Sequence, residues 1–112
     1  MKVILHVDEE GKLEVALGNI KNLLKLNKDI IIELLVHGHP IFNLKEDYAK
    51  EHGVFSDLKD VSDNGVVIAA CNNSLNKFNI NKDELLAFVK VVPAGVMELI
   101  EKQNEGFAYV KP

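Results

Sequence analysis

Apolar and polar residues follow one another along the chain in blocks that predict strands and helices in turn. Short apolar runs bounded by polar residues or glycine are typical of buried strands. Five such runs occur, at residues 3–7, 30–36, 66–70, 88–92 and 107–110. Between the first two, apolar residues recur at helical spacing, which predicts an amphipathic helix over residues 11–27. Further helices are expected at residues 43–52, 56–61, 74–78 and 93–106.

The regular succession of strand and helix predicts an α/β fold with parallel strands and helices on both faces of the sheet. In such folds, ligands bind beyond the carboxyl ends of the strands. The residues at these ends are Asp8, His37, Cys71 and Pro93. Parallel pairing would bring them to one edge of the sheet, so this edge is the candidate site.

Three local signals refine the element boundaries. Asn43 and Glu46 have the spacing of a capping box, as do Asn81 and Glu84, so a helical turn is expected to begin at each pair. Pro93 suits the first position of the last helix, because that position needs no backbone N–H. These signals indicate where the helical segments between the predicted strands begin.

Glu33 interrupts the otherwise apolar second strand. A carboxylate is costly to bury in the dry centre of a sheet. The sequence therefore predicts that this strand lies at a sheet edge or meets a partner chain.

Composition indicates one ordinary globular domain over residues 1–112. The chain is 47% hydrophobic and 27% charged, with a net charge of −4 and dispersed basic residues. This charge pattern argues against nucleic acid as a partner, because nucleic-acid binding needs a positive surface. No apolar stretch approaches the roughly 20 residues of a membrane span. The single cysteine excludes an internal disulfide, so a cytoplasmic location is expected.

Cys71 ends the third predicted strand and is followed at once by a predicted helix. A thiol at a helix N-terminus meets unpaired backbone N–H groups and the positive end of the helix dipole, both of which favour the reactive thiolate. The alternative is an inert, buried small hydrophobe, which is common for free cysteines. The spacing alone leaves both interpretations open.

His37 is the candidate partner of this thiol, as a hydrogen-bonding or protonating neighbour, although a solvated loop histidine is an equal alternative. His37 and His39, together with Cys71, supply three atoms of the kind that bind zinc. The spacing is common, there is no second cysteine, and neither His6 nor His52 is tied to the set. No metal and no other cofactor are therefore expected.

Small and polar residues follow two of the predicted strand ends. Asparagine and serine after the cysteine are either donors for an anion or merely caps and turn formers. Small residues after the fourth strand either hold an anion at a helix N-terminus or allow close packing. The candidate binding residues are Gly38, Asn72, Asn73, Ser74, Pro93, Ala94 and Gly95.

Several of these segments resemble the DsrE/DsrF-like sulfur-relay superfamily. The resemblance is carried by His37-Gly38 and by residues 68–75, 91–99 and 103–112. It is greatest to the small, single-domain branch of the superfamily and covers nearly the full length. It implies a three-layer α/β/α sandwich with a five-stranded, mainly parallel sheet, and symmetric homo-oligomers such as trimers or hexamers. It also implies that Cys71 accepts sulfur as a persulfide and passes it on.

Two functional hypotheses from different classes follow. The first is a sulfur carrier or sulfurtransferase-like protein, with Cys71 as nucleophile, His37 beside it, and separate donor and acceptor proteins. The second is a non-catalytic oligomeric module that holds a small anion or nucleotide at the same edge. Replacing Cys71 by serine separates them, because only the first needs the thiol. A thiol redox sensor is a weaker third hypothesis, since the chain has no resolving cysteine.

Overall fold

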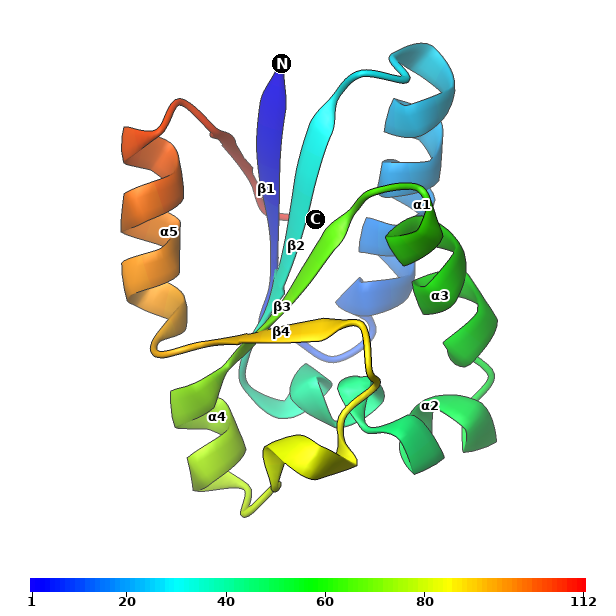
Figure 1. Cartoon of the computed structure of the whole chain (residues 1–112), viewed down its shortest axis with the longest axis vertical. Helices are drawn as coiled ribbons and strands as arrows, with labels where there is room; N and C mark the ends of the chain where they lie inside the picture. The colour runs from blue at the N-terminus through cyan, green and yellow to red at the C-terminus, as the bar shows by residue number, and fades with distance from the viewer.

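The computed structural model describes residues 1–112, with strands and helices in alternation (Figure 1). The strands are β1 (Lys2–Val7), β2 (Ile31–Val36), β3 (Val67–Cys71), β4 (Val89–Val92) and β5 (Ala108–Val110). The α-helices are α1 (Lys12–Leu26), α2 (Glu46–Glu51), α3 (Phe55–Asp63), α4 (Asn72–Lys77) and α5 (Gly95–Asn104). Two short 3-10 helices, η1 (His39–Leu44) and η2 (Lys82–Glu84), complete the chain. None of the helices has both the length and the apolar character needed to cross a membrane.

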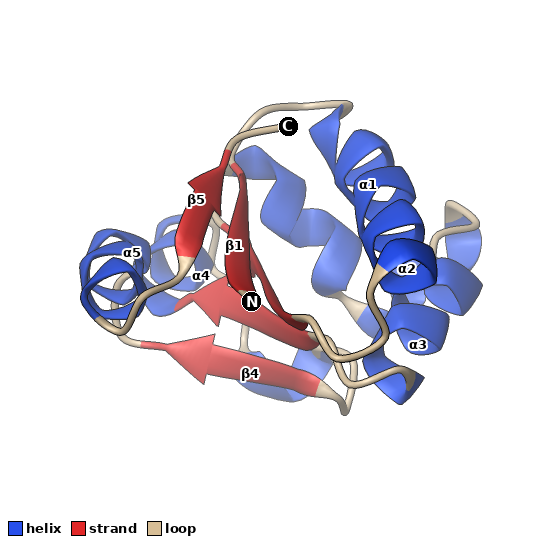
Figure 2. Ribbon diagram, turned by 90° about the horizontal axis from the view of Figure 1, so that it is seen from above, coloured by secondary structure: helices blue, strands red, loops and turns tan.

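The five strands form one parallel sheet in the order β4-β3-β2-β1-β5. Helices α1, α2 and α3 cover one face, and α4 and α5 lie on the other side of the strands (Figure 2). The predicted three-layer α/β fold is therefore confirmed. The register aligns Val7 with Val36, Val36 with Ala70, and Cys71 with Val92, so the carboxyl ends of β1 to β4 meet at one edge.

The two faces of the sheet are packed very differently. Alternate residues of the strands, such as Val3, Leu5 and Val7 of β1, belong to a large core shared with α1 and α3. On the opposite face, under α5, the fully apolar cluster is small and consists of Ile4, Leu35, Ala69 and Val92. The remaining positions of this second face are available for polar groups.

The predicted edge position of the second strand is wrong. β2 is the central strand, and Glu33 is only 3% exposed. Its carboxyl lies beneath α5 and hydrogen-bonds that of Glu98, which is 6% exposed. Burial, followed by this hydrogen bond and the charge of Glu98, raises the pKa of Glu33 to about 8. The carboxyl is thus accommodated in the centre because it can keep its proton.

Two other local predictions are wrong, and one is confirmed. Asn43 does not cap α2, because a 3-10 helix already contains it and its side chain donates to the Pro40 carbonyl at 3.0 Å. Pro93 is not in α5, which begins at Gly95 after an extended Ala94. The capping box of Asn81 and Glu84 is present, with both reciprocal hydrogen bonds at 2.8 Å.

Candidate functional site

The site lies where the carboxyl ends of β2 and β3 meet the start of α5. In Figure 1, β3 leads into α4 and β4 leads into α5 on the same side of the molecule. This arrangement places Cys71 directly before α4 and beside Gly95, the first residue of α5. The structure thus brings together Cys71, Ser74, His37 and Gly95, four of the residues that the sequence marks as candidates.

Cys71 is buried, at 5% exposure, and its sulfur accepts a hydrogen bond from the start of α5. The backbone N–H of Gly95 donates to Sγ at 3.2 Å. Burial is the largest single effect on the thiol and by itself raises its pKa. The backbone N–H groups of Ser74 and Gly95, the Ser74 hydroxyl and the N–H of Asn73 outweigh it together, so the pKa of Cys71 is lowered. The surroundings therefore favour a thiolate.

Ser74 connects the thiol to the loop that follows β2. Its Oγ accepts a hydrogen bond from the backbone N–H of Gly38 at 2.9 Å, and its hydroxyl contributes to the lowered pKa of the Cys71 thiol. Gly38 has a φ of 70°, and a Cβ there would lie 3.2 Å from the Asp8 carbonyl oxygen. Glycine is needed at this position for both reasons. Gly38 thus fixes the loop against α4.

Gly95 allows the closest approach in the site. A Cβ added to it would lie 2.6 Å from Nδ1 of His37 and 3.5 Å from Cβ of Cys71. His37 and Cys71 therefore both pack against the backbone of Gly95. Only a residue without a side chain fits between them in this conformation.

His37 is half-buried, and its two nitrogens have different surroundings. Nε2 lies 3.2 Å from Nε2 of His6 and 3.8 Å from Oδ2 of Asp8. Nδ1 is buried and has no hydrogen-bond partner. Burial is the main effect that lowers the pKa of His37, and the charge of Asp8 only partly opposes it. The neutral ring is therefore favoured at this position.

His6 is the residue that sequence reasoning missed. The sequence gives no link between His6 and His37, whereas in the structure the two rings are 4.5 Å apart between centroids. Its Nδ1 is 2.8 Å from the hydroxyl of Tyr109 in β5. The available signal was strand alternation: His6 shares with Ile4 the face of β1 opposite to Leu5. A polar residue on this face of β1, close to the carboxyl end of the strand, is expected to lie at the candidate site.

The other predicted residues are placed less closely to the thiol. His39 is exposed and pairs with Glu10, so it does not join His37. Asn73 is also exposed, and its contribution to the sulfur is its backbone N–H. Asn72 and Ala94 are half-buried and Pro93 is exposed. These residues form the rim of the site.

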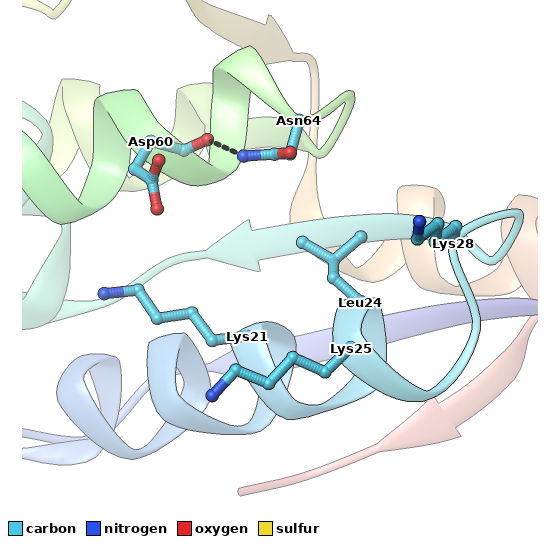
Figure 3. Close-up of a pocket in the computed structure, with 6 residues that line it drawn as sticks. All are labelled: Lys21, Leu24, Lys25, Lys28, Asp60 and Asn64. Atoms are coloured by element: carbon cyan, nitrogen blue, oxygen red, sulfur yellow. Dashed lines mark hydrogen bonds between the residues drawn. The ribbon is translucent and has the colours of Figure 1, made fainter.

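The larger surface hollow of the molecule is elsewhere. It measures about 540 Å³ and lies between α1 and the end of α3, lined by three lysines with Leu24, Asp60 and Asn64 (Figure 3). Lys21, one of these lysines, is paired with Asp57 at 2.6 Å. Cys71 lines neither this hollow nor the smaller one. The candidate site therefore lies outside both hollows, with its thiol only 5% exposed.

Comparison with known proteins finds one family and several solved structures that this chain resembles over nearly its full length. The model of the DsrE/DsrF-like family matches residues 2–112. A protein of unknown function from Methanobacterium thermoautotrophicum, MTH1491, is 28% identical, with a TM-score of 0.90 over 99% of this chain and 98% of that one. No curated protein matches the chain.

Two more distant structures share the fold. BT1422 of Bacteroides thetaiotaomicron, of unknown function, is 15% identical with a TM-score of 0.76, over 99% of this chain and 94% of its own. The ychN protein of E. coli is 13% identical with a TM-score of 0.74, over 99% and 97%. The fold thus extends over nearly the whole of each compared chain.

Proposed function

Because this chain belongs to the DsrE/DsrF-like family, we propose that it is a sulfur carrier that holds a persulfide on Cys71. The thiolate of Cys71 attacks the outer sulfur of a donor persulfide, R–S–SH. A new sulfur–sulfur bond forms to Cys71, the old one breaks, and the donor leaves as R–SH. Attack of an acceptor thiolate on the same outer sulfur releases Cys71 again. No external oxidant is consumed, because the sulfane sulfur moves between equivalent thiols.

The observation that carries this proposal is the polar surroundings of Sγ. A buried thiol with only apolar neighbours would stay protonated, whereas this one receives the Gly95 N–H at 3.2 Å, and the nearby polar groups of Ser74 and Asn73 also lower its pKa. The same donors suit a persulfide anion. Oriented N–H groups at a developing negative charge are what such a transfer requires.

His37 is the second residue assigned to the reaction. Its unpaired Nδ1 faces the Gly95 backbone, against which Cys71 also packs. In the tautomer protonated at Nδ1, this atom is a donor for the outer sulfur of the persulfide. The exposed rim residues Asn73 and Pro93 mark the side from which a donor protein would approach.

Mass spectrometry of the intact protein tests the sulfur-carrier proposal. Incubation with inorganic polysulfide is expected to add sulfur to the chain, and a thiol reductant is expected to remove it. The variant Cys71→Ser must not be loaded. Cys71 is the only cysteine, so loading of any other site is excluded by composition. A wild-type protein that stays unloaded, while phosphate or a nucleotide binds it and the serine variant equally, would favour the anion-binding module instead.

We further propose that the protein acts in the cytoplasm as a homo-oligomer, a trimer or hexamer. The reducing cytoplasm suits a single free thiol. The oligomer is supported by exposed apolar residues on α5, where Val96, Met97 and Ile100 are all more than half exposed. Apolar residues grouped in this way are typical of subunit contacts.

A further inference from the structure

Three metal-binding atoms from the ends of β1 and β2 converge beside the thiol site. They are Nε2 of His6, Nε2 of His37 and a carboxylate oxygen of Asp8, all within 4.8 Å of one another. His6 is 7% exposed, and the side chains of His37 and Asp8 are 26% and 31% exposed. The cluster thus has one buried ligand and an open side.

The spacing of the two imidazoles matches that of metal ligands. Their Nε2 atoms are 3.2 Å apart. Two nitrogens at the usual zinc–nitrogen distance in a tetrahedral site are about 3.3 Å apart. Asp8 is the looser ligand, since its Oδ2 lies 3.8 Å from His37 Nε2.

The atoms of His6 and Asp8 that face away from the cluster are held by other residues. The Tyr109 hydroxyl lies 2.8 Å from Nδ1 of His6, which suits the tautomer with a lone pair on Nε2. Lys111 donates to Oδ1 of Asp8 at 2.7 Å and leaves Oδ2 facing His37. Such outer hydrogen bonds are a regular feature of metal-ligating histidines and carboxylates. Both outer residues come from β5 or follow it, so the last strand completes the arrangement.

We propose that His6, Asp8 and His37 bind one first-row divalent transition metal, with an open coordination position toward solvent. Two imidazoles and one carboxylate suit Zn²⁺, Fe²⁺ or Co²⁺, whereas Mg²⁺ and Ca²⁺ prefer oxygen ligands. Cys71 is not a ligand, because its sulfur bonds the Gly95 N–H and is not part of the cluster. This set differs from the three residues weighed as zinc ligands on sequence grounds, which are His37, His39 and Cys71. The proposal replaces the expectation, drawn from the sequence, that the protein holds no metal.

Metal titration of the purified apoprotein tests this proposal. Calorimetry with Zn²⁺ is expected to show one ion per chain, and Mg²⁺ in place of Zn²⁺ is expected to show no binding. Asp8→Asn and His37→Gln are expected to weaken zinc binding at least tenfold. Tyr109→Phe, which keeps all three ligands, is expected to weaken it about 10- to 100-fold through loss of the outer hydrogen bond.

Matched controls separate this site from surface histidines and from the sulfur chemistry. His39→Gln and His52→Gln alter exposed histidines outside the cluster and are expected to bind zinc as the wild type does. Cys71→Ser is expected to lose sulfur loading but to retain the metal. The Co²⁺ spectra of the wild type and of this variant are both expected to lack a thiolate charge-transfer band. If Asp8→Asn binds zinc normally, or if His39→Gln abolishes binding, the proposed site is wrong. A cobalt–thiolate band in the wild type would also overturn it.

Discussion

At the scale of single residues, Gly95 determines how closely the parts of the site can approach. Its backbone N–H bonds the Cys71 sulfur, and its missing side chain makes room for the His37 ring. The ring cannot easily move away, since its other nitrogen is 3.2 Å from His6. The close packing of His37 and Cys71 therefore depends on one glycine.

Gly95→Ala is expected to destabilise the protein and disturb the thiol. The added methyl would lie 2.6 Å from His37 Nδ1, so either the ring or the start of α5 must shift. Overpacking of this kind costs about 1–3 kcal/mol. Urea denaturation measures the loss. Gly18→Ala in α1 is the control. Nothing lies within 4 Å of a Cβ added at Gly18, so the free energy of unfolding is expected to rise by up to about 1 kcal/mol. Equal stability of the Gly95 variant and the wild type would contradict the packing argument.

The Cys71 thiol is expected to ionise below the ordinary cysteine pKa of about 8.5. The donors of Ser74, Gly95 and Asn73 together outweigh the effect of burial. The pH dependence of iodoacetamide labelling of the native protein measures this pKa. Ser74→Ala is expected to raise it, whereas Ser56→Ala, at an exposed serine of α3, leaves it unchanged. A wild-type midpoint at or above the ordinary value would leave only the inert, structural interpretation of the thiol.

The sequence predicts the edge at which Cys71, His37 and Gly95 meet, because parallel strands end together. It does not predict the contacts of His6. Those depend on Tyr109, which reaches the same face only because β5 pairs with β1 in a register that aligns Tyr109 with Ile4. Nothing in the local pattern around residue 109 specifies that pairing.

At the scale of elements, α5 is attached to the sheet partly by two carboxyl groups. Glu33 of β2 and Glu98 of α5 are both buried, and each has one oxygen without a hydrogen-bond partner. Two carboxylates this close cannot both ionise cheaply, so one proton between them is favoured. The contact between helix and sheet is therefore linked to pH.

Glu33→Gln is expected to stabilise the protein at neutral and alkaline pH. Burial, then the hydrogen bond and charge of Glu98, raise the pKa of Glu33 to about 8. A raised folded-state pKa means that the native protein binds the proton more tightly than the unfolded chain does. This contribution is complete below about pH 4.3, the unfolded value, and is lost as pH rises toward 8. The amide keeps a donor for Glu98 at every pH and removes this loss.

Thermal melts from pH 5 to pH 9 measure this effect. The wild type is expected to lose on the order of a few kcal/mol over this range through Glu33. The glutamine variant is expected to show a flatter profile. Glu101→Gln, at an exposed position of α5, is the matched control and is expected to retain the wild-type profile. Parallel profiles for the wild type and Glu33→Gln would contradict a shared buried proton.

The element boundaries show where local signals suffice. The Asn81 and Glu84 cap forms although Glu84 also pairs with Lys45, because its two carboxyl oxygens are used separately: Oε2 accepts the Asn81 N–H and Oε1 lies 3.4 Å from the lysine. The same spacing fails at Asn43, because Asn43 lies inside η1, where its side chain donates to the Pro40 carbonyl. The edge position predicted from Glu33 failed for a different reason. The cost of burial applies to an ionised group, whereas the carboxyl of Glu33, beside Glu98 from 65 residues further along, stays protonated.

At the scale of the whole molecule, the sheet is covered unevenly. α1 and α3 share a large core with one face, whereas the other face has a small apolar cluster under α5. α5 turns its buried side, with Gly95 and Glu98, to the sheet. Its apolar residues Val96, Met97 and Ile100 point outward at helical spacing, with 65%, 52% and 51% exposure. A surface helix of a monomer usually turns its apolar residues to the core and its charged residues to solvent. In α5 these apolar residues face outward and Glu98 faces the sheet, which is the reverse.

This surface is expected to join copies of the chain, as the family resemblance implies. Light scattering over a dilution series of the wild type is expected to give a trimer or hexamer. Ile100→Lys is expected to shift the mass toward the monomer by burying a charge in the contact. Leu26→Lys is the control, because Leu26 is 84% exposed at the end of α1, on the other face of the sheet. The same contact is also expected to affect the thiol. Val96 directly follows Gly95, so the contact would reach the rim of the thiol site. Dissociated Ile100→Lys is therefore also expected to label faster at Cys71. A wild-type protein that stays monomeric at high concentration would contradict both the contact and its effect on the thiol.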